Sequence, residues 1–130
     1  MKRIYKWKKN GKGKEFREDK LRFEVEYLNG EKNGKWKEYR YGELSFDGIY
    51  LNGKRHGKGK QYMNNILRFE GEFINGKKNG KGKEYNNDNK IIFEGEYIDG
   101  KRWNGKLIEY LNNGSILEDK YINGKSLGEK

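Results

Sequence analysis

One eight-residue pattern occurs four times in this chain, and its repetition constrains the fold more than any other feature. The pattern begins with Phe and ends in Asn-Gly or Asp-Gly, at residues 23–30, 46–53, 69–76 and 93–100. The leading Phe therefore recurs at intervals of 23, 23 and 24 residues. Units of this length, repeated at a fixed period, stack side by side and contact only their neighbours. We expect an extended scaffold whose function lies on its surface.

Within each repeat, apolar residues occupy every second position, which is typical of a strand with one buried face. One such row consists of Leu44, Phe46, Gly48 and Tyr50. Each row ends at Asn-Gly or Asp-Gly, which tolerates the positive φ angles of tight hairpin turns, and a second strand follows each turn. The pattern predicts an all-β fold, an elongated single-layer antiparallel meander of repeated β-hairpins with about ten strands and no helix.

The repeats predict a single domain that covers the whole chain. The first and last segments each hold only part of a unit, so we expect partial units at both ends. The expected boundaries are a partial unit at 1–20, full units that start near 21, 44, 67 and 91, and a partial unit at 111–130.

A glycine stands between the aromatic residues of three repeats, at Gly48, Gly71 and Gly95. Glycine weakens a strand, so its repetition indicates close approach by another group. We expect a ring from the neighbouring unit to lie over each glycine. The same rings would form a grooved aromatic face, which is a candidate binding surface made by Phe46, Tyr50, Phe69, Phe73, Phe93 and Tyr97.

Charged residues make up 38% of the chain, with a formal net charge of +10. On the face opposite the aromatics, first strands carry pairs such as Glu70 and Glu72, and second strands carry pairs such as Lys58 and Lys60. Opposite charges on paired strands stabilise a sheet by about 0.2–1 kcal/mol per pair. We interpret this face as solvated and self-neutralised.

A second group of cations follows the turns, where acidic residues are few. Stacking of the units aligns these cations as a basic ridge, which attracts anions. Protection of the sheet edge against aggregation is the alternative role. The ridge consists of Lys54, Arg55, Lys77, Lys78, Lys101 and Arg102.

The repeats resemble the MORN repeat, whose pattern runs Tyr-x-Gly-x-Trp, then a turn ending in Gly, then His-Gly-x-Gly. Residues 46–59 match it almost position by position, and the resemblance extends over residues 23–110, with Tyr or Phe in place of the Trp. The resemblance implies an elongated single-layer β-sheet used for protein interaction and self-association. It also implies acidic phospholipids as a ligand, because such binding is often proposed for the family.

Our leading hypothesis is a non-catalytic scaffold that mediates protein–protein interaction, with acidic phospholipids as a second ligand. A second copy that pairs through the exposed terminal units is another candidate partner. The alternative is an immunity or antitoxin protein that neutralises a partner toxin. The segment 34–39 supports it, because it resembles a MORN-variant group that includes proposed toxin-neutralising proteins.

Residue composition argues against catalysis and metal binding. The only histidine, His56, occupies a repeat position that elsewhere holds Asn33, Asn79 and Asn104, which suits a side chain that stabilises a turn. Without Cys and with one His, a metal site is not expected, and we expect no catalytic residue and no cofactor.

We expect no nucleic-acid partner, although the chain is basic, because its aromatic residues alternate on the inward strand face. The chain also contains no apolar run of membrane-spanning length and no signal-peptide core. We therefore expect an intracellular protein in the cytoplasm or at the periphery of a membrane or the cytoskeleton.

Overall fold

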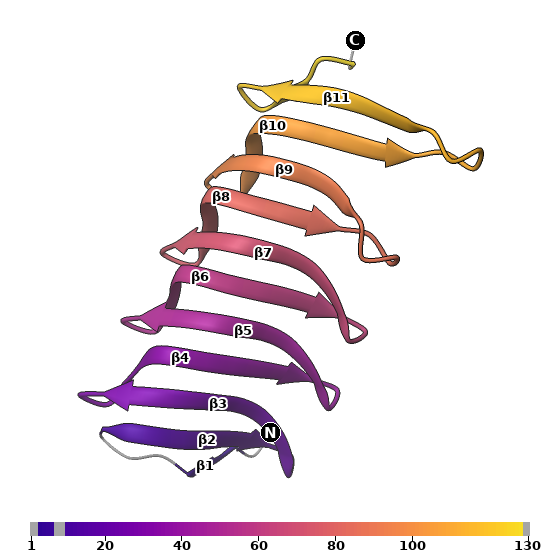
Figure 1. The fold of residues 1–130 in the computed structure, drawn as a ribbon. Coiled ribbons are helices and arrows are strands. Elements are labelled where there is room, and N and C mark those ends of the chain that lie inside the picture. The colour runs from indigo at the N-terminus through magenta and orange to yellow at the C-terminus, as the bar shows by residue number, and fades with distance from the viewer. Residues whose placement is uncertain (1–2, 7–9, 129–130) are drawn as a thin grey trace.

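The computed structural model describes residues 3–6 and 10–128, and its strands form one antiparallel sheet (Figure 1). The strands lie side by side in chain order, so each is hydrogen-bonded to its neighbours in sequence. They are β1 (Arg3–Lys6), β2 (Gly11–Arg17), β3 (Lys20–Leu28), β4 (Glu31–Arg40), β5 (Glu43–Leu51), β6 (Lys54–Met63), β7 (Ile66–Ile74), β8 (Lys77–Tyr85), β9 (Ile91–Ile98), β10 (Lys101–Tyr110), β11 (Ile116–Ile122) and β12 (Lys125–Ser126).

This architecture confirms the expected all-β meander of hairpins. The sheet has twelve strands rather than about ten, because the short strands β1 and β12 extend it at the two ends. The outermost parts of the expected partial units, residues 1–2, 7–9 and 129–130, lie outside the described ranges. Within those ranges there is no helix of the length and apolarity needed to cross a membrane.

Two-residue turns join the strands of each repeat. Between β5 and β6, Asn52 and Gly53 have φ angles of 52° and 79°, which a type I′ turn requires at both central positions. Leu51 and Lys54 therefore face each other at the last rung of the hairpin. The other repeats turn in the same way, at Asn29-Gly30, Asn75-Gly76, Asp99-Gly100 and Asn123-Gly124.

A line of glycines crosses the middle of the sheet. From β5 to β10 the register places six of them opposite one another, at Gly48, Gly59, Gly71, Gly82, Gly95 and Gly105. A Cβ atom on Gly59 would lie 2.5 Å from Cζ of Phe46, and one on Gly82 would lie 2.7 Å from Cε1 of Phe69. The absence of side chains in this line thus makes room for the rings.

The ring over each first-strand glycine differs from the one we expected. Gly48 lies beneath Phe46 of its own strand, because a Cβ atom there would meet Cζ of Phe46 at 2.6 Å. The ring of the next hairpin, Phe73, approaches the second-strand residue Gly59 instead. Side chains in a strand lean along the strand, which lets a Phe cover the position two residues further on.

The core consists of these rings and their neighbours. Edge-to-face pairs join successive hairpins, with centroid distances of 5.5 Å for Phe46–Phe73 and 5.2 Å for Phe69–Tyr97. Such pairs contribute about 0.5–1.5 kcal/mol beyond the area they bury. The expected stacking of aromatic residues across unit boundaries is confirmed. The buried apolar residues are Val25, Tyr27, Trp36, Phe46, Tyr50, Phe69, Phe73, Phe93 and Tyr97.

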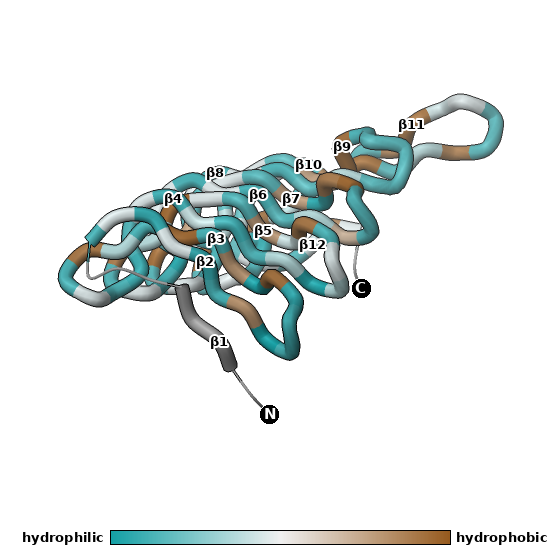
Figure 2. The backbone as a smooth tube through the Cα atoms, turned by 90° about the horizontal axis from the view of Figure 1, so that it is seen from below, coloured by the Kyte–Doolittle hydropathy of each residue, from teal (hydrophilic) through white to brown (hydrophobic). Residues whose placement is uncertain are grey.

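A β-bulge removes the leading aliphatic residue of each repeat from this row. Tyr39 pairs with Leu44 and Glu38 pairs with Phe46, so Ser45 is an extra residue on β5. Leu44 and Phe46 consequently face opposite sides, whereas the alternation in sequence had placed them together. Figure 2 shows hydrophobic and hydrophilic positions intermixed along the strands.

The last full repeat keeps its glycine line through a change of register. Arg102 pairs with Tyr97 and Asn104 pairs with Glu96, so Trp103 between them forms a bulge. As a result Gly105 pairs with Gly95, and Leu107, which takes the repeat position of Gly59, does not. A Cβ atom on Gly105 would lie 2.9 Å from Cζ of Phe93. The register therefore gives Phe93 a glycine where Leu107 would have blocked it.

Substitution of Gly71 tests this packing. A Cβ atom there would lie 2.6 Å from the carbonyl oxygen of Lys81 and 2.8 Å from Cζ of Phe69. Gly71→Val should therefore lower stability by about 1–3 kcal/mol, measured by urea unfolding. Lys81→Val, at an exposed site on the next strand, is the control and should change stability little. Equal stability of the two variants would contradict the packing role.

Candidate binding surface

The aromatic face is covered and is not available to a partner in this structure. All six residues expected to form it are buried, with 0–6% of each exposed. Turn cations cover the phenylalanine rings, with Cζ of Arg55 3.9 Å from the Phe46 centroid and Nζ of Lys78 4.1 Å from the Phe69 centroid. The grooved aromatic face that was a candidate binding surface is thus the core of the sheet, because one layer can bury its rings only beneath its own side chains.

The expected basic ridge divides into two sets that point to opposite faces. Successive residues of a strand alternate between faces, so Lys54 and Arg55 cannot share one surface. The half-buried set lies over the rings and comprises Arg55, Lys78 and Arg102. The exposed set lies on the other face and comprises Lys54, Lys77 and Lys101.

The two arginines over the rings are held by carboxylates. Both Nε and Nη2 of Arg102 donate to Glu84, at 2.8 and 2.7 Å, and the hydroxyl of Tyr97 donates to the same carboxylate. Burial by itself would raise the pKa of Glu84. The hydrogen bonds from Arg102 and Tyr97, with the attraction of the nearby cations, instead hold the pKa below its usual value.

The equivalent positions of the preceding repeat lack these groups. Gln61 and Phe73 occupy the places of Glu84 and Tyr97, so the hairpin before Lys78 offers no carboxylate where Glu84 holds Arg102. Burial is the main reason that the pKa of Lys78 is lowered. Attraction to Glu84 opposes this shift in part, and repulsion from Arg102 and Arg55 adds to it. This repeat therefore buries a cation with less compensation than its neighbours.

The exposed lysines belong to a row that the hairpin turns form on the face opposite the aromatics. In each of four hairpins an aliphatic residue ends the first strand and pairs with a lysine that begins the second. We call these positions, with the first hairpin's Leu28 and Glu31, the turn row. Its other members are Leu51, Lys54, Ile74, Lys77, Ile98, Lys101, Ile122 and Lys125.

The turn row is exposed and carries unpaired positive charge. Its five aliphatic residues are 44–51% exposed. Among the residues that the structure describes, its four lysines form no ion pair with a carboxylate. The row therefore combines apolar contact area with free cations at regular intervals.

Hydrogen bonds between hairpins fix the turns of this row relative to one another. The amide of Gly53 donates to the carbonyl of Lys32, and the amide of Gly76 donates to the carbonyl of Arg55, at 3.0 and 2.8 Å. The side-chain oxygen of Asn33 accepts from the amide of Asn52 at 2.8 Å. Asn104 binds the amide of Asn123 in the same way, so the turn-stabilising role expected at this repeat position is confirmed for Asn33 and Asn104.

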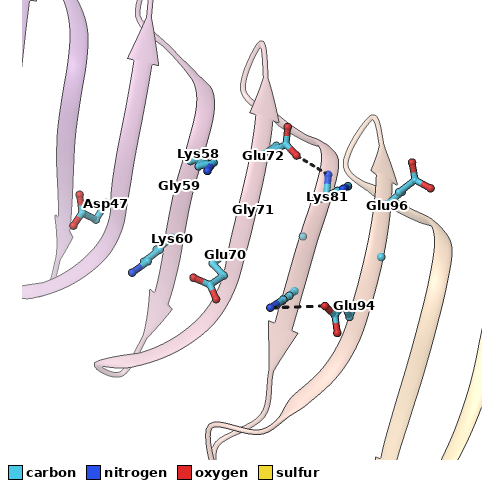
Figure 3. Close-up of a pocket in the computed structure, with 13 residues that line it drawn as sticks. Asp47, Lys58, Gly59, Lys60, Glu70, Gly71, Glu72, Lys81, Glu94 and Glu96 are labelled. Carbon is cyan, nitrogen blue, oxygen red and sulfur yellow. Dashed lines mark hydrogen bonds and ion pairs between the residues drawn. The ribbon is translucent and has the colours of Figure 1, made fainter.

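A ladder of alternating charges runs beside the turn row on the same face. The register pairs each of its lysines with acidic neighbours, which confirms the expected cross-strand charge pairs. A shallow trough of about 820 Å³ lies along it over β5–β9 (Figure 3). The ladder consists of Lys14, Glu24, Lys37, Asp47, Lys60, Glu70, Lys83, Glu94 and Lys106.

Tyrosines extend the ladder towards the other long edge of the sheet. The hydroxyl of Tyr39 donates to Glu24, and that of Tyr85 donates to Glu70. The bond to Glu24 is the main reason that the pKa of Tyr39 rises to about 12, and burial followed by the bond to Glu70 raises the pKa of Tyr85 to about 12. These contacts use up acceptor capacity of the carboxylates, so the ladder offers less free charge than the turn row.

The C-terminal end of the sheet is only partly covered. Strand β12 pairs with β11 at Tyr121 and Ile122, and Asp119 accepts hydrogen bonds from Ser126 and the amide of Gly128. Ile116 and Leu117 are each 54% exposed. Pairing of two copies through the terminal strands stays a prediction.

In the part of the chain that the structure describes, no three His, Cys, Asp or Glu residues are placed to hold a metal ion. His56 is half-buried and takes the repeat position of Asn33. No arrangement of a nucleophile and a base emerges around it among the described contacts.

The family model of the MORN repeat matches residues 46–65 and 69–90. These segments comprise most of β5–β8 and hold the glycines over which Phe46 and Phe69 lie. No curated protein matches the chain. Residues 46–65 and 69–90 are thus MORN repeats, and MORN repeats are generally non-catalytic and associated with scaffolds that bind proteins or membranes.

Sequence reasoning missed the apolar half of the turn row. The signal was present, because Leu or Ile precedes the Asn-Gly or Asp-Gly turn in all five repeats. The aromatic alternation alone assigns these residues no role. The expected basic ridge also grouped adjacent cations that the pleat of the strands directs to opposite faces.

The Glu84 cluster should make stability depend on acid. Folding lowers the pKa of Glu84 from 4.5, so its contribution is complete above that pH and is lost as the pH falls through the folded value. Glu84→Gln should lower stability at pH 7 by about 1–2 kcal/mol and weaken the loss below pH 4.5. Thermal melts between pH 7 and 3 measure this, with the exposed Glu96→Gln as a control that should retain the acid dependence of the wild type.

Gln61→Glu should restore a carboxylate beside Lys78. Because Lys78 is half-buried and the preceding hairpin offers it Gln61 in place of a carboxylate, the variant should gain about 0.5–1 kcal/mol at pH 7. Urea unfolding at low and high salt measures the gain, which should shrink at high salt. A variant less stable than the wild type would show that Lys78 needs no partner.

Proposed function

We propose that this protein is a non-catalytic repeat scaffold that binds an acidic protein partner through its turn row. The observation that carries the proposal is the recurrence of an exposed, unpaired lysine at the same place in four successive hairpins, Lys54, Lys77, Lys101 and Lys125. Repetition matters because each exposed charge contributes little alone, whereas several contacts on one rigid frame add together.

Acidic phospholipid headgroups are the second candidate ligand of the same lysines. Each basic residue near an anionic membrane surface contributes about 1 kcal/mol. Half-exposed aliphatic residues beside the lysines favour a protein partner, since a protein surface can supply apolar as well as acidic groups. Edge protection is the alternative role, in which the lysines only deter aggregation.

Charge reversal in the turn row tests the proposal. Lys77→Glu/Lys101→Glu should weaken capture of acidic proteins on the immobilised chain by at least about tenfold, because both reversed charges face the partner. Lys20→Glu/Arg40→Glu is the matched control, since it changes the net charge equally at exposed sites outside the turn row. Affinity purification at low and high salt with quantitative mass spectrometry measures the difference.

Equal loss of partners from both double variants would show that overall charge, not the turn row, governs binding. Flotation with phosphatidylserine vesicles forms the lipid arm. Binding of the wild type to vesicles but to no acidic protein would replace the protein partner with the membrane.

A further inference from the structure

The turn row has a spacing that restricts what can lie along it. Its aliphatic residues stand on every second strand, and neighbouring strands lie about 4.8 Å apart, so they recur about every 9.6 Å. The lysines recur at the same interval and are displaced by one strand. A partner that follows the row therefore meets an apolar group and a cation in alternation.

The turn row is also fixed before any partner binds. The inter-hairpin hydrogen bonds at Gly53, Gly76 and Gly100 hold three consecutive turns to the hairpins before them. Binding along a preformed row avoids the entropy loss of ordering flexible loops. Regular spacing on a rigid frame favours an equally regular partner.

The depth of the aliphatic residues argues against insertion into a bilayer. Ile74 and Ile98 are 46% and 44% exposed, so about half of each side chain already packs against the sheet. Shallow contact along a narrow segment suits this surface better than contact with a flat membrane.

We propose that the turn row is a docking site for an acidic amphipathic helix of a partner protein, which rests on the proposed function above. In an α-helix the same face recurs every seven residues, or about 10.5 Å, which is within about 1 Å of the spacing of the hairpins. Aliphatic residues at this interval would contact Leu51, Ile74 and Ile98. Acidic residues half an interval further along would face Lys54, Lys77 and Lys101.

This arrangement explains why aliphatic residues and lysines are paired across each turn. Charge alone would attract many acidic chains without selecting among them, because long-range attraction governs encounter more than fit. The aliphatic positions add a requirement for apolar groups at matching intervals. Selection then depends on the order of residues in the partner and not only on its charge.

Two synthetic peptides test the proposal on the full chain. One is a 21-residue amphipathic helix with Leu at every seventh position and Glu about half an interval after each Leu. The other has the same composition, but its Leu positions are shuffled. Fluorescence anisotropy should show that the wild type binds the regular peptide about tenfold more tightly than the shuffled one. Equal binding of the two peptides would overturn the proposal.

Variants of the chain separate the apolar contribution from the charge. Ile74→Ser/Ile98→Ser should weaken binding of the regular peptide about tenfold and leave binding of the shuffled peptide unchanged. Met63→Ser/Leu117→Ser is the matched control, at exposed apolar residues outside the turn row, and should bind as the wild type does. Circular dichroism and thermal melts confirm that each variant is folded.

Three outcomes decide between the proposals. If Ile74→Ser/Ile98→Ser binds the regular peptide as tightly as the wild type does, helix docking is overturned. The proposed function would still stand if Lys77→Glu/Lys101→Glu loses its acidic partners. Loss of phosphatidylserine vesicle binding in Ile74→Ser/Ile98→Ser, with no preference for the regular peptide, would assign the row to a membrane. Selective binding of the regular peptide that depends on both pairs of residues would support helix docking.

Discussion

A phenylalanine ring that lies across two facing glycines is the contact on which this single-layer sheet depends. The sheet has no second layer, so a ring standing upright on it would be open to water on most sides. Lying flat over Gly48 and Gly59, the ring of Phe46 contacts the backbone of two strands beneath it, and Arg55 covers it from above. Phe46 is thereby fully buried in a structure one strand thick. This contact recurs at Phe69 and Phe93, and edge-to-face ring pairs such as Phe46–Phe73 then join one hairpin to the next.

The requirement to cover the rings assigns different roles to adjacent residues of each turn. The second cation of the turn folds over the ring, where Glu38 and Glu84 neutralise Arg55 and Arg102. The first cation of each turn, such as Lys54, does not cover a ring. It points to the other face, next to an exposed aliphatic residue. Core packing and the proposed binding thus use neighbouring positions of one repeated motif. The surface most open to a partner is the turn row, because the aromatic side is closed and the charge ladder is largely self-paired.

The repeats are similar but not equivalent, and their differences follow from the same contact. Where Leu107 would have stood opposite Gly95, the register changes so that Gly105 lies beneath Phe93. Where Gln61 replaces a glutamate, Lys78 covers the ring of Phe69 with less compensation for its charge. At the C-terminal end Asp119 and Ser126 form a polar contact at the last strand pair. The ring contact is retained in each full repeat from β5 to β10 while its surroundings vary.

The sequence by itself determined the all-β class, the hairpins and their turns, because a fixed period, alternation by two and Asn-Gly are local signals that neighbouring residues create. It also indicated the charge ladder, since pairing of Lys-rich and Glu-rich strands follows from their order. Only the tertiary structure decided which ring covers which glycine, that a bulge removes Leu44 from the aromatic row, and that Arg55 and Lys54 serve opposite faces. These features depend on register between strands and on the direction of side chains across them. A one-residue shift in register reverses the face of every side chain, so periodicity alone could not distinguish a buried aromatic core from an aromatic binding surface.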